Sequence, residues 1–226
     1  MLLVHTSGPD VLRNLGRPAL AFISVLMLAS CTSGGSETKA ADPCGISPTS
    51  QEGELVRSVL GTEDFSTKAY GPTSSLVDKA ERALRVMGPE KDTFYTNVCG
   101  YGTEDERRDA RVIFLAGWSL RTSAVPSAPN DASYAWNGAR GVTNESRSSL
   151  LVPCDMPGEL KTQSQKVWLT ADMTYTFGPT RPDVNQAVKD RRMTFAYLMA
   201  RRVTEALGCE NEPLSKPPVV SPVPTP

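Results

Sequence analysis

The sequence lacks an apolar run long enough to cross a membrane. Its most apolar stretch, Ala19–Ala29, is about half as long as the roughly 20 residues that a spanning helix needs. Arg13 and Arg17 precede this stretch, and a short apolar core behind a basic start is typical of a secretory signal. We therefore expect residues 1–30 to be a signal peptide, and we do not expect a transmembrane anchor here.

The residues that end this stretch resemble a bacterial lipobox. They are Leu28-Ala29-Ser30-Cys31, a leucine and two small residues followed by the cysteine that accepts the lipid. The resemblance implies that Cys31 carries a diacylglyceryl group and starts the mature protein. Because two acyl chains suffice for stable anchoring, it also implies a protein attached by its lipid to the extracytoplasmic face of the cell membrane. The alternative is an ordinary cleaved signal in which Cys31 is incidental.

Histidine is nearly absent too. The only one, His5, falls within the predicted signal peptide, so the mature chain is expected to have none. This excludes a Ser-His-Asp triad, a Cys-His pair and zinc bound by histidine. Catalysis would have to depend on carboxylates, lysine or tyrosine. No catalytic motif is recognisable in the folded part, and neither a metal nor a cofactor is expected.

Neither sign of charge is in excess. The chain has 24 Lys and Arg residues against 25 Asp and Glu residues, a formal net charge of −1. A nucleic-acid-binding protein needs a basic face, so we expect no nucleic-acid partner. The acidic cluster at Glu104–Asp109 lacks the spacing of a calcium loop and contains its own arginines. It predicts a solvated, self-paired connection.

Closely spaced cysteine pairs of the kind that bind zinc are also missing. An even number of cysteines outside the cytoplasm predicts two disulfides, for which three connectivities exist. In sequential pairing Cys44 would join Cys99 and Cys154 would join Cys209. The equal intervals between these cysteines leave two interpretations open, an internal repeat of strand, cysteine and strand, or chance. Apart from Cys31, the cysteines are Cys44, Cys99, Cys154 and Cys209.

The two ends of the mature chain contain few large apolar residues. Residues 31–41 are small and polar, which predicts a flexible tether. Residues 213–226 are rich in proline and predict a disordered tail, either solvated or a ligand for a partner. Between them we expect a single folded domain over residues 42–212, which is long enough to bury a core.

Apolar periodicity predicts the elements of this domain. Helical spacing marks a short helix at 55–60, a clearer one over 75–87 and a long one over 184–207. We expect Asp183 to be the N-cap of the long helix and Gly208 to lie just past its end. The arginines of this helix, Arg192 among them, are assigned to its solvated face.

Residues of high β-propensity predict strands at 94–98, 111–118, 149–152 and 167–177. Helices followed by strands and a closing helix indicate an α+β fold. We expect an antiparallel sheet of about four strands, packed against helices that include a long C-terminal one and stapled by two disulfides.

One long segment, residues 119–147, shows no helical or strand period, and a loop of this length is usually functional or disordered. The hypothesis is a binding loop made of residue types that are common on recognition surfaces. In the alternative, the two aromatic residues fold back onto the core and Asn137-Gly138 forms a hairpin turn. The residues of the possible binding loop are Tyr134, Trp136, Asn137 and Arg140.

Asp42-Pro43-Cys44, with a further cysteine downstream, resembles the start of a broad group of actinobacterial cell-envelope lipoproteins of unknown function. The resemblance covers the N-terminal part and the cysteine layout. It implies an envelope protein with an α+β domain, and it carries over no known activity.

Three functions stay open. The first is a membrane-anchored extracytoplasmic module that binds an unknown envelope protein or small ligand. The second is a carboxylate-dependent envelope hydrolase, which would need paired Asp or Glu residues facing each other in a pocket. The third is a structural or accessory subunit that docks through its proline-rich tail.

Overall fold

The computed structural model describes residues 42–88, 95–103, 110–122, 130–178, 183–216 and 222–223. The predicted signal peptide, Cys31, the tether and the acidic cluster at 104–109 lie outside these residues. Within the described part of the chain, no helix combines the length and the apolar character that crossing a bilayer requires.

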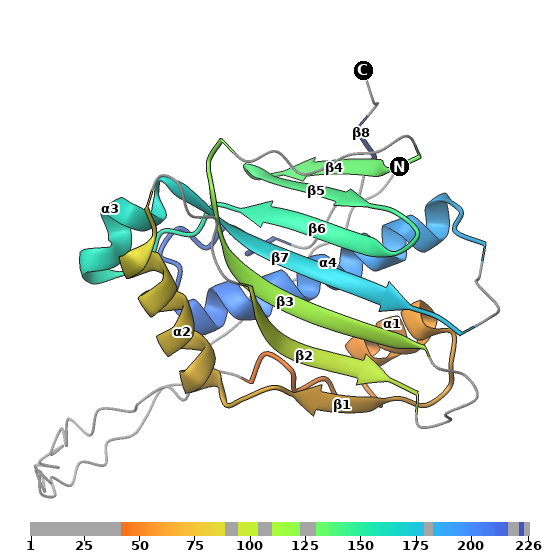
Figure 1. Cartoon of the computed structure of the whole chain (residues 1–226). Coiled ribbons are helices and arrows are strands. Elements are labelled where there is room, and N and C mark those ends of the chain that lie inside the picture. The colour runs from red at the N-terminus through yellow and green to blue at the C-terminus, as the bar shows by residue number, and fades with distance from the viewer. Residues whose placement is uncertain are drawn as a thin grey trace, which may run out of the picture. The chain divides into compact units, whose positions relative to one another are not determined.

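The fold is built around one antiparallel sheet of eight strands. The strands are β1 (Ser66–Ala69), β2 (Thr96–Gly102), β3 (Arg111–Leu120), β4 (Ala132–Trp136), β5 (Ala139–Thr143), β6 (Arg147–Val152), β7 (Val167–Thr176) and β8 (Pro222–Val223). Their order across the sheet is β1-β2-β3-β7-β6-β5-β4-β8 (Figure 1). The predicted α+β class is therefore confirmed, while the expected count of about four strands is too low.

The predicted strands correspond to β2, β3, β6 and β7, which lie side by side in the middle of the sheet. The missed strands flank them. β4 and β5 occupy the segment 119–147, for which a structureless loop was expected, and that expectation is wrong. Asn137 and Gly138 join the two strands with φ of 46° and 82°, the left-handed backbone of a two-residue hairpin turn.

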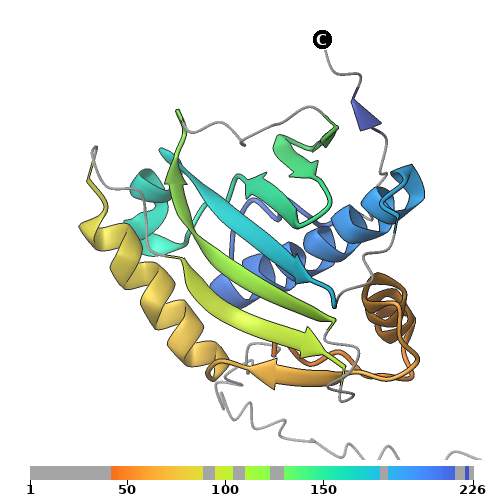
Figure 2. The same cartoon turned by 45° about the vertical axis from the view of Figure 1, so that its right-hand side comes forward.

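The helices are α1 (Gln51–Leu60), α2 (Thr73–Val86), α3 (Lys161–Ser164) and α4 (Gln186–Leu207), with a 3₁₀ turn at Gly158–Leu160. Helix α4 runs behind the sheet in the two views of Figure 1 and Figure 2. It is capped by Asn185, whose side chain accepts a hydrogen bond from the backbone of Val188, so the expected Asp183 cap is wrong. Gly208 ends the helix at φ 67°, as predicted.

The hydrophobic core lies between the sheet and α4. Trp118 donates an indole hydrogen bond to the carbonyl of Ala80 at 2.9 Å, which brings α2 to the same side of the sheet as α4. We call this side the core face and the opposite side the open face. From Leu169 to Tyr175, every second side chain of β7 is buried opposite a buried residue of β3, although Trp168, Thr170 and Asp172 on the other side of the strand are buried as well. These pairs are Val112–Tyr175, Phe114–Met173, Ala116–Ala171 and Trp118–Leu169.

Two disulfides staple this core in sequential order. Cys44 joins Cys99 and Cys154 joins Cys209, each across 55 residues. Cys99 lies inside β2, whereas Cys154 follows the end of β6. Cys99 also pairs with a cysteine that precedes it, whereas Cys154 pairs with one that follows it. The two halves of the supposed repeat are thus stapled differently.

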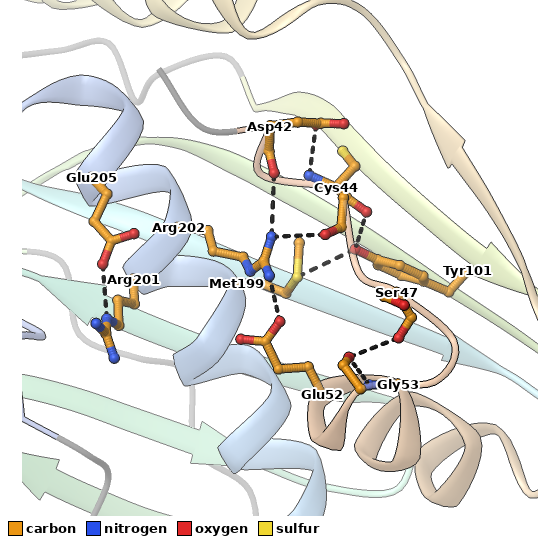
Figure 3. Close-up of polar contacts among 12 residues, drawn as sticks. Asp42, Cys44, Ser47, Glu52, Gly53, Tyr101, Met199, Arg201, Arg202 and Glu205 are labelled. Atoms are coloured by element: carbon orange, nitrogen blue, oxygen red, sulfur yellow. Dashed lines mark hydrogen bonds and ion pairs between the residues drawn. The ribbon is translucent and has the colours of Figure 1, made fainter. Parts of the chain in front are cut away.

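The Asp42-Pro43-Cys44 motif forms a clamp between the N-terminal segment and α4 (Figure 3). The Asp42 carboxylate accepts a hydrogen bond from the backbone of Cys44 at 2.9 Å, which fixes the turn. Arg202 of α4 donates to the carbonyls of Asp42 and Gly45 at 3.2 and 3.3 Å. It also forms an ion pair with Glu52 of α1. The start of the domain is therefore held by a covalent bond and by a charged side chain.

Arg192 departs most strongly from expectation. It was assigned to the solvated face of the long helix, yet it is only 1% exposed. Its guanidinium lies 4.6 Å from the centre of the Tyr175 ring. It donates hydrogen bonds to the carbonyls of Asn144 and Glu145 at 3.0 and 2.7 Å, in the turn between β5 and β6. The side chain ties this turn to α4 from inside the protein.

The ordered chain also continues past the predicted domain boundary at residue 212. Leu214 is buried, and the Tyr197 hydroxyl donates a hydrogen bond to its carbonyl at 3.1 Å. Beyond it, Pro222–Val223 form β8 on the edge of β4. Burial of an apolar side chain and backbone pairing fix these residues, so the expectation of a disordered tail does not hold for them.

Gly53 provides a test of packing at the start of α1. A Cβ atom at this position would meet the carbonyl oxygen of Ser47 and would lie 2.6 Å from that of Pro48. We expect Gly53→Ala to lower the free energy of unfolding by about 2 kcal/mol, because the backbone must move. In Gly88→Ala the new Cβ meets nothing within 4 Å, so the change should stay within about 0.5 kcal/mol. Denaturant unfolding measures both, and equal effects would contradict the expectation.

Candidate functional site

The open face of the sheet is strongly cationic. Strand register places on it Lys68 of β1, Arg111 of β3, Arg140 of β5 and Arg147 of β6. The same register places one carboxylate there, Asp172 of β7, which is buried. A chain with a net charge of −1 therefore segregates positive charge onto one side of its sheet.

Two arginines converge on one tryptophan of this face. The guanidinium carbon of Arg121, just beyond the end of β3, lies 3.8 Å from the centre of the Trp168 ring, and that of Arg140 lies 5.2 Å from it. Trp168 is 5% exposed and donates its indole N–H to the carbonyl of Arg121 at 3.4 Å. The two guanidinium groups thus cover an aromatic side chain that would otherwise face solvent. We call these three residues the Trp168 cluster.

The charges of the Trp168 cluster are incompletely compensated. Within the described ranges, no ion pair engages either Arg121 or Arg140. Burial lowers the pKa of Arg121, the carboxylate of Asp155 raises it, and the positive charge of Arg140 lowers it by a smaller amount. These shifts indicate that an anion bound beside the two arginines would be favoured electrostatically.

The middle of the open face is a fixed polar network. Arg147 binds Asp172 through two hydrogen bonds of 2.8 and 3.2 Å, and Ser149 donates to the same carboxylate. Tyr95 lies above this group. Burial raises the pKa of its phenol, and the negative charge of Asp172 raises it further. Because Arg147 and Asp172 neutralise each other, the net positive charge of the face rests on Lys68, Arg111 and Arg140.

The far end of the open face holds a shallow cavity of about 200 Å³. Lys68 and Arg111 line it, together with Tyr70 and the glycines of β2. The Lys68 ammonium lies 5.1 Å from the centre of the Tyr70 ring. Since Gly100 and Gly102 contribute no side chains, the backbone of β2 lines this cavity at these positions. A cation beside an aromatic ring thus recurs at both ends of the face.

The four residues of the possible binding loop do not form one site. Tyr134 and Trp136 are on the core face, with ring centres 6.4 Å apart, and the Tyr134 hydroxyl donates to Asp190 of α4 at 2.8 Å. Asn137 lies in the hairpin turn, and Arg140 is on the open face. Strand alternation separates the arginine from the aromatic residues. The alternative, in which the aromatic residues fold back onto the core, describes the geometry.

Sequence reasoning missed Arg121 and Trp168. One signal was present, because Trp168 occupies the polar side of the alternating strand at 167–177, where a large aromatic residue is unusual. Its partners Arg121 and Arg140 come from distant parts of the sequence, and only the strand order brings them together.

Neither a metal centre nor a pair of catalytic carboxylates is apparent in the parts of the chain that the structure describes. No group of three or more His, Cys, Asp and Glu residues there is arranged to hold an ion. The buried carboxylate of Asp172 faces an arginine, whereas the hydrolase hypothesis requires a second carboxylate. No protein-family model, no curated protein and no solved structure matches this chain.

Proposed function

We propose that the chain is an exported, lipid-anchored binding module of the cell envelope, which holds an anionic ligand on its open face. Export and anchoring are supported by the sequence around Leu28–Cys31. The ligand class is supported by one observation above the others, the two arginines of the Trp168 cluster.

The chemistry of arginine supports a phosphate or carboxylate ligand. A guanidinium presents a planar fork of N–H donors that matches both groups, and it is more weakly hydrated than an ammonium. Contact with the Trp168 ring restrains Arg121 and Arg140, and within the described residues neither guanidinium is engaged by an ion pair. An anion between them interacts with both positive charges at once. Little side-chain entropy is lost on binding because contact with Trp168 already orders the two arginines.

The extent of the open face favours a ligand with several anionic groups. Arg111 and Arg121 lie at opposite ends of β3, about 33 Å apart at roughly 3.3 Å per residue. Lys68 stands beside Arg111, and Arg140 beside Arg121. An extended phosphate- or carboxylate-bearing envelope polymer would therefore reach both ends, whereas a small anion would occupy only the Trp168 cluster.

Binding of labelled inorganic polyphosphate to the full chain in detergent tests the proposal, with polyglutamate as the carboxylate probe. Each charge-assisted hydrogen bond contributes about 1.5–3 kcal/mol. We therefore expect Arg121→Gln/Arg140→Gln to weaken binding at least about tenfold, and raised salt to weaken it in the wild type. Fluorescence anisotropy gives the dissociation constants.

The control is Arg201→Gln on α4, which removes one positive charge, against two in the double variant, from a side chain paired with Glu205. Its affinity for either probe should stay within about twofold of the wild type. The proposal fails if the double variant binds as tightly as the wild type. It also fails if Arg201→Gln weakens binding as much per charge removed, since the attraction would then be to net charge alone.

A further inference from the structure

A strip of aromatic side chains runs along the junction of β4 and α4. Trp136 of β4 and Tyr197 of α4 stack, with ring centres 5.5 Å apart and an angle of 18° between the ring planes. Tyr134 continues the strip beside Trp136. We call Tyr134, Trp136 and Tyr197 the aromatic strip. It lies on the core face, on the opposite side of the sheet from the Trp168 cluster.

The C-terminal segment already touches this strip at two places. The Tyr197 hydroxyl lies within hydrogen-bonding distance of the backbone carbonyls of Leu214 and Lys216. Further along, Pro222 and Val223 pair with Tyr134 and Ser133 of β4. Two separate parts of the same proline-rich segment are thus held at the two ends of the strip.

Trp136 carries a donor that these contacts do not use. Its indole N–H is buried, and no acceptor for it is found in the described part of the chain. An indole N–H can only donate, and a buried donor without an acceptor is unfavourable. Trp136 lies between Tyr197, which binds Leu214 and Lys216, and Tyr134, which pairs with Pro222.

A proline-rich segment has the chemistry that this strip requires. Proline has no backbone N–H, so the carbonyls of such a segment lack partners within it and are free to accept hydrogen bonds. Grooves lined by aromatic residues bind proline-rich segments by packing rings against them. The strip offers stacked rings together with two donors, the Tyr197 hydroxyl and the Trp136 indole.

We propose that the aromatic strip is a binding site for an extended proline-rich segment, and that its occupant is the C-terminal tail of the same chain, residues 213–226. The tail docks on the core-face side of β4 and covers the edge of that strand, which would otherwise offer unpaired backbone groups to other chains. This site takes a different ligand class from the open face and is independent of the proposed anion binding.

The test follows hydrogen exchange at the Trp136 indole by NMR, with the signal assigned by its loss in Trp136→Phe. In the full chain we expect exchange at least tenfold slower than in a chain that ends at Lys216. A synthetic peptide of residues 213–226 added to the truncated chain should restore slow exchange. A control peptide with alanine at every proline should restore it at least fivefold less effectively.

Tyr197→Phe in the full chain provides a second measurement that does not depend on truncation. It keeps the ring and removes the hydroxyl donor, so exchange at the Trp136 indole should become several-fold faster. Equal exchange in the full and truncated chains, with no effect of the peptide, would overturn the proposal. A dimer that truncation dissolves, seen by analytical ultracentrifugation, would overturn the assignment of the tail to its own chain and place a second copy on the strip.

Discussion

Arg192→Ala is expected to lower the free energy of unfolding by about 4 kcal/mol. The substitution removes two charge-assisted hydrogen bonds to the carbonyls of Asn144 and Glu145, each of which contributes about 1.5–3 kcal/mol. It also removes the cation that lies over the Tyr175 ring and leaves a cavity inside the protein. Denaturant unfolding followed by circular dichroism measures the loss.

Arg192→Met separates packing from charge at the same position. Methionine fills most of the volume and ends the cost of burying a guanidinium whose Nε and Nη2 atoms have no hydrogen-bond partner in the described chain. Burial also lowers the pKa of Arg192, which indicates that the charge is unfavourable there. The expected loss is therefore only about 1–2 kcal/mol. If the two variants lose the same free energy of unfolding, the two hydrogen bonds to the turn dominate, and the expected gain from filling the cavity and removing the buried charge is wrong.

Arg191→Ala is the matched control. Arg191 is exposed on the same turn of α4, so its removal should change the free energy of unfolding by no more than about 0.5 kcal/mol. A large effect at Arg191 would mean that the arginines of this turn act through the helix itself and not through the contacts of Arg192.

The buried position of Arg192 could have been predicted from helical spacing. Arg192, Ala196, Met199 and Val203 recur at intervals of three or four residues, and all four are buried on α4. The stripe therefore continues toward the N-terminus through a charged residue. The prediction missed this part of the stripe because an arginine among other charged residues is usually solvated. Its acceptors are backbone carbonyls of a distant turn, and a sequence pattern does not indicate these.

The strands that β-propensity predicted are those in the middle of the sheet. β2, β3, β6 and β7 are rich in apolar and β-branched residues and form the middle of the sheet. β1 is exposed along its whole length, so it lacks the alternation that marks a half-buried strand. β4 and β5 are five residues each. Their hairpin was visible only in Asn137-Gly138, which was considered as the alternative to a binding loop.

The Trp168 cluster lay beyond prediction for a topological reason. Arg121 follows the end of β3, and Trp168 lies near the start of the paired strand β7, while Arg140 comes from β5. Strand order must be known before the three can be placed together. Net charge misled as well, because a balanced total says nothing about how charge is divided between two faces of a sheet.

Opening either disulfide by a double Cys→Ala substitution is expected to cost about 4 kcal/mol. The two bridges make an internal comparison, because each spans 55 residues and the chain-entropy model depends on the length of the closed loop. All four cysteines are also buried, so the substitutions remove similar packing. Cys44→Ala/Cys99→Ala and Cys154→Ala/Cys209→Ala should therefore lower the free energy of unfolding about equally, as measured with denaturant under non-reducing conditions.

The two variants should differ in where the protein opens locally. Without the first bridge, the N-terminal segment is still held by Arg202, which binds the carbonyls of Asp42 and Gly45 and pairs with Glu52. Without the second, Asn211 still binds the backbone of Asp155 and Pro153. Hydrogen exchange should therefore quicken only around the bridge that was removed.

A gap of more than about 2 kcal/mol between the two variants would contradict the entropic account and assign the difference to native contacts. Adding Arg202→Met to each variant then identifies the source. If the clamp and the Cys44–Cys99 bridge hold the same segment, the substitution costs more where that bridge is missing, and the two losses are not additive. In the variant that lacks Cys154–Cys209, the same substitution should add its own cost and nothing further, because Arg202 does not contact that end of the chain in the described residues.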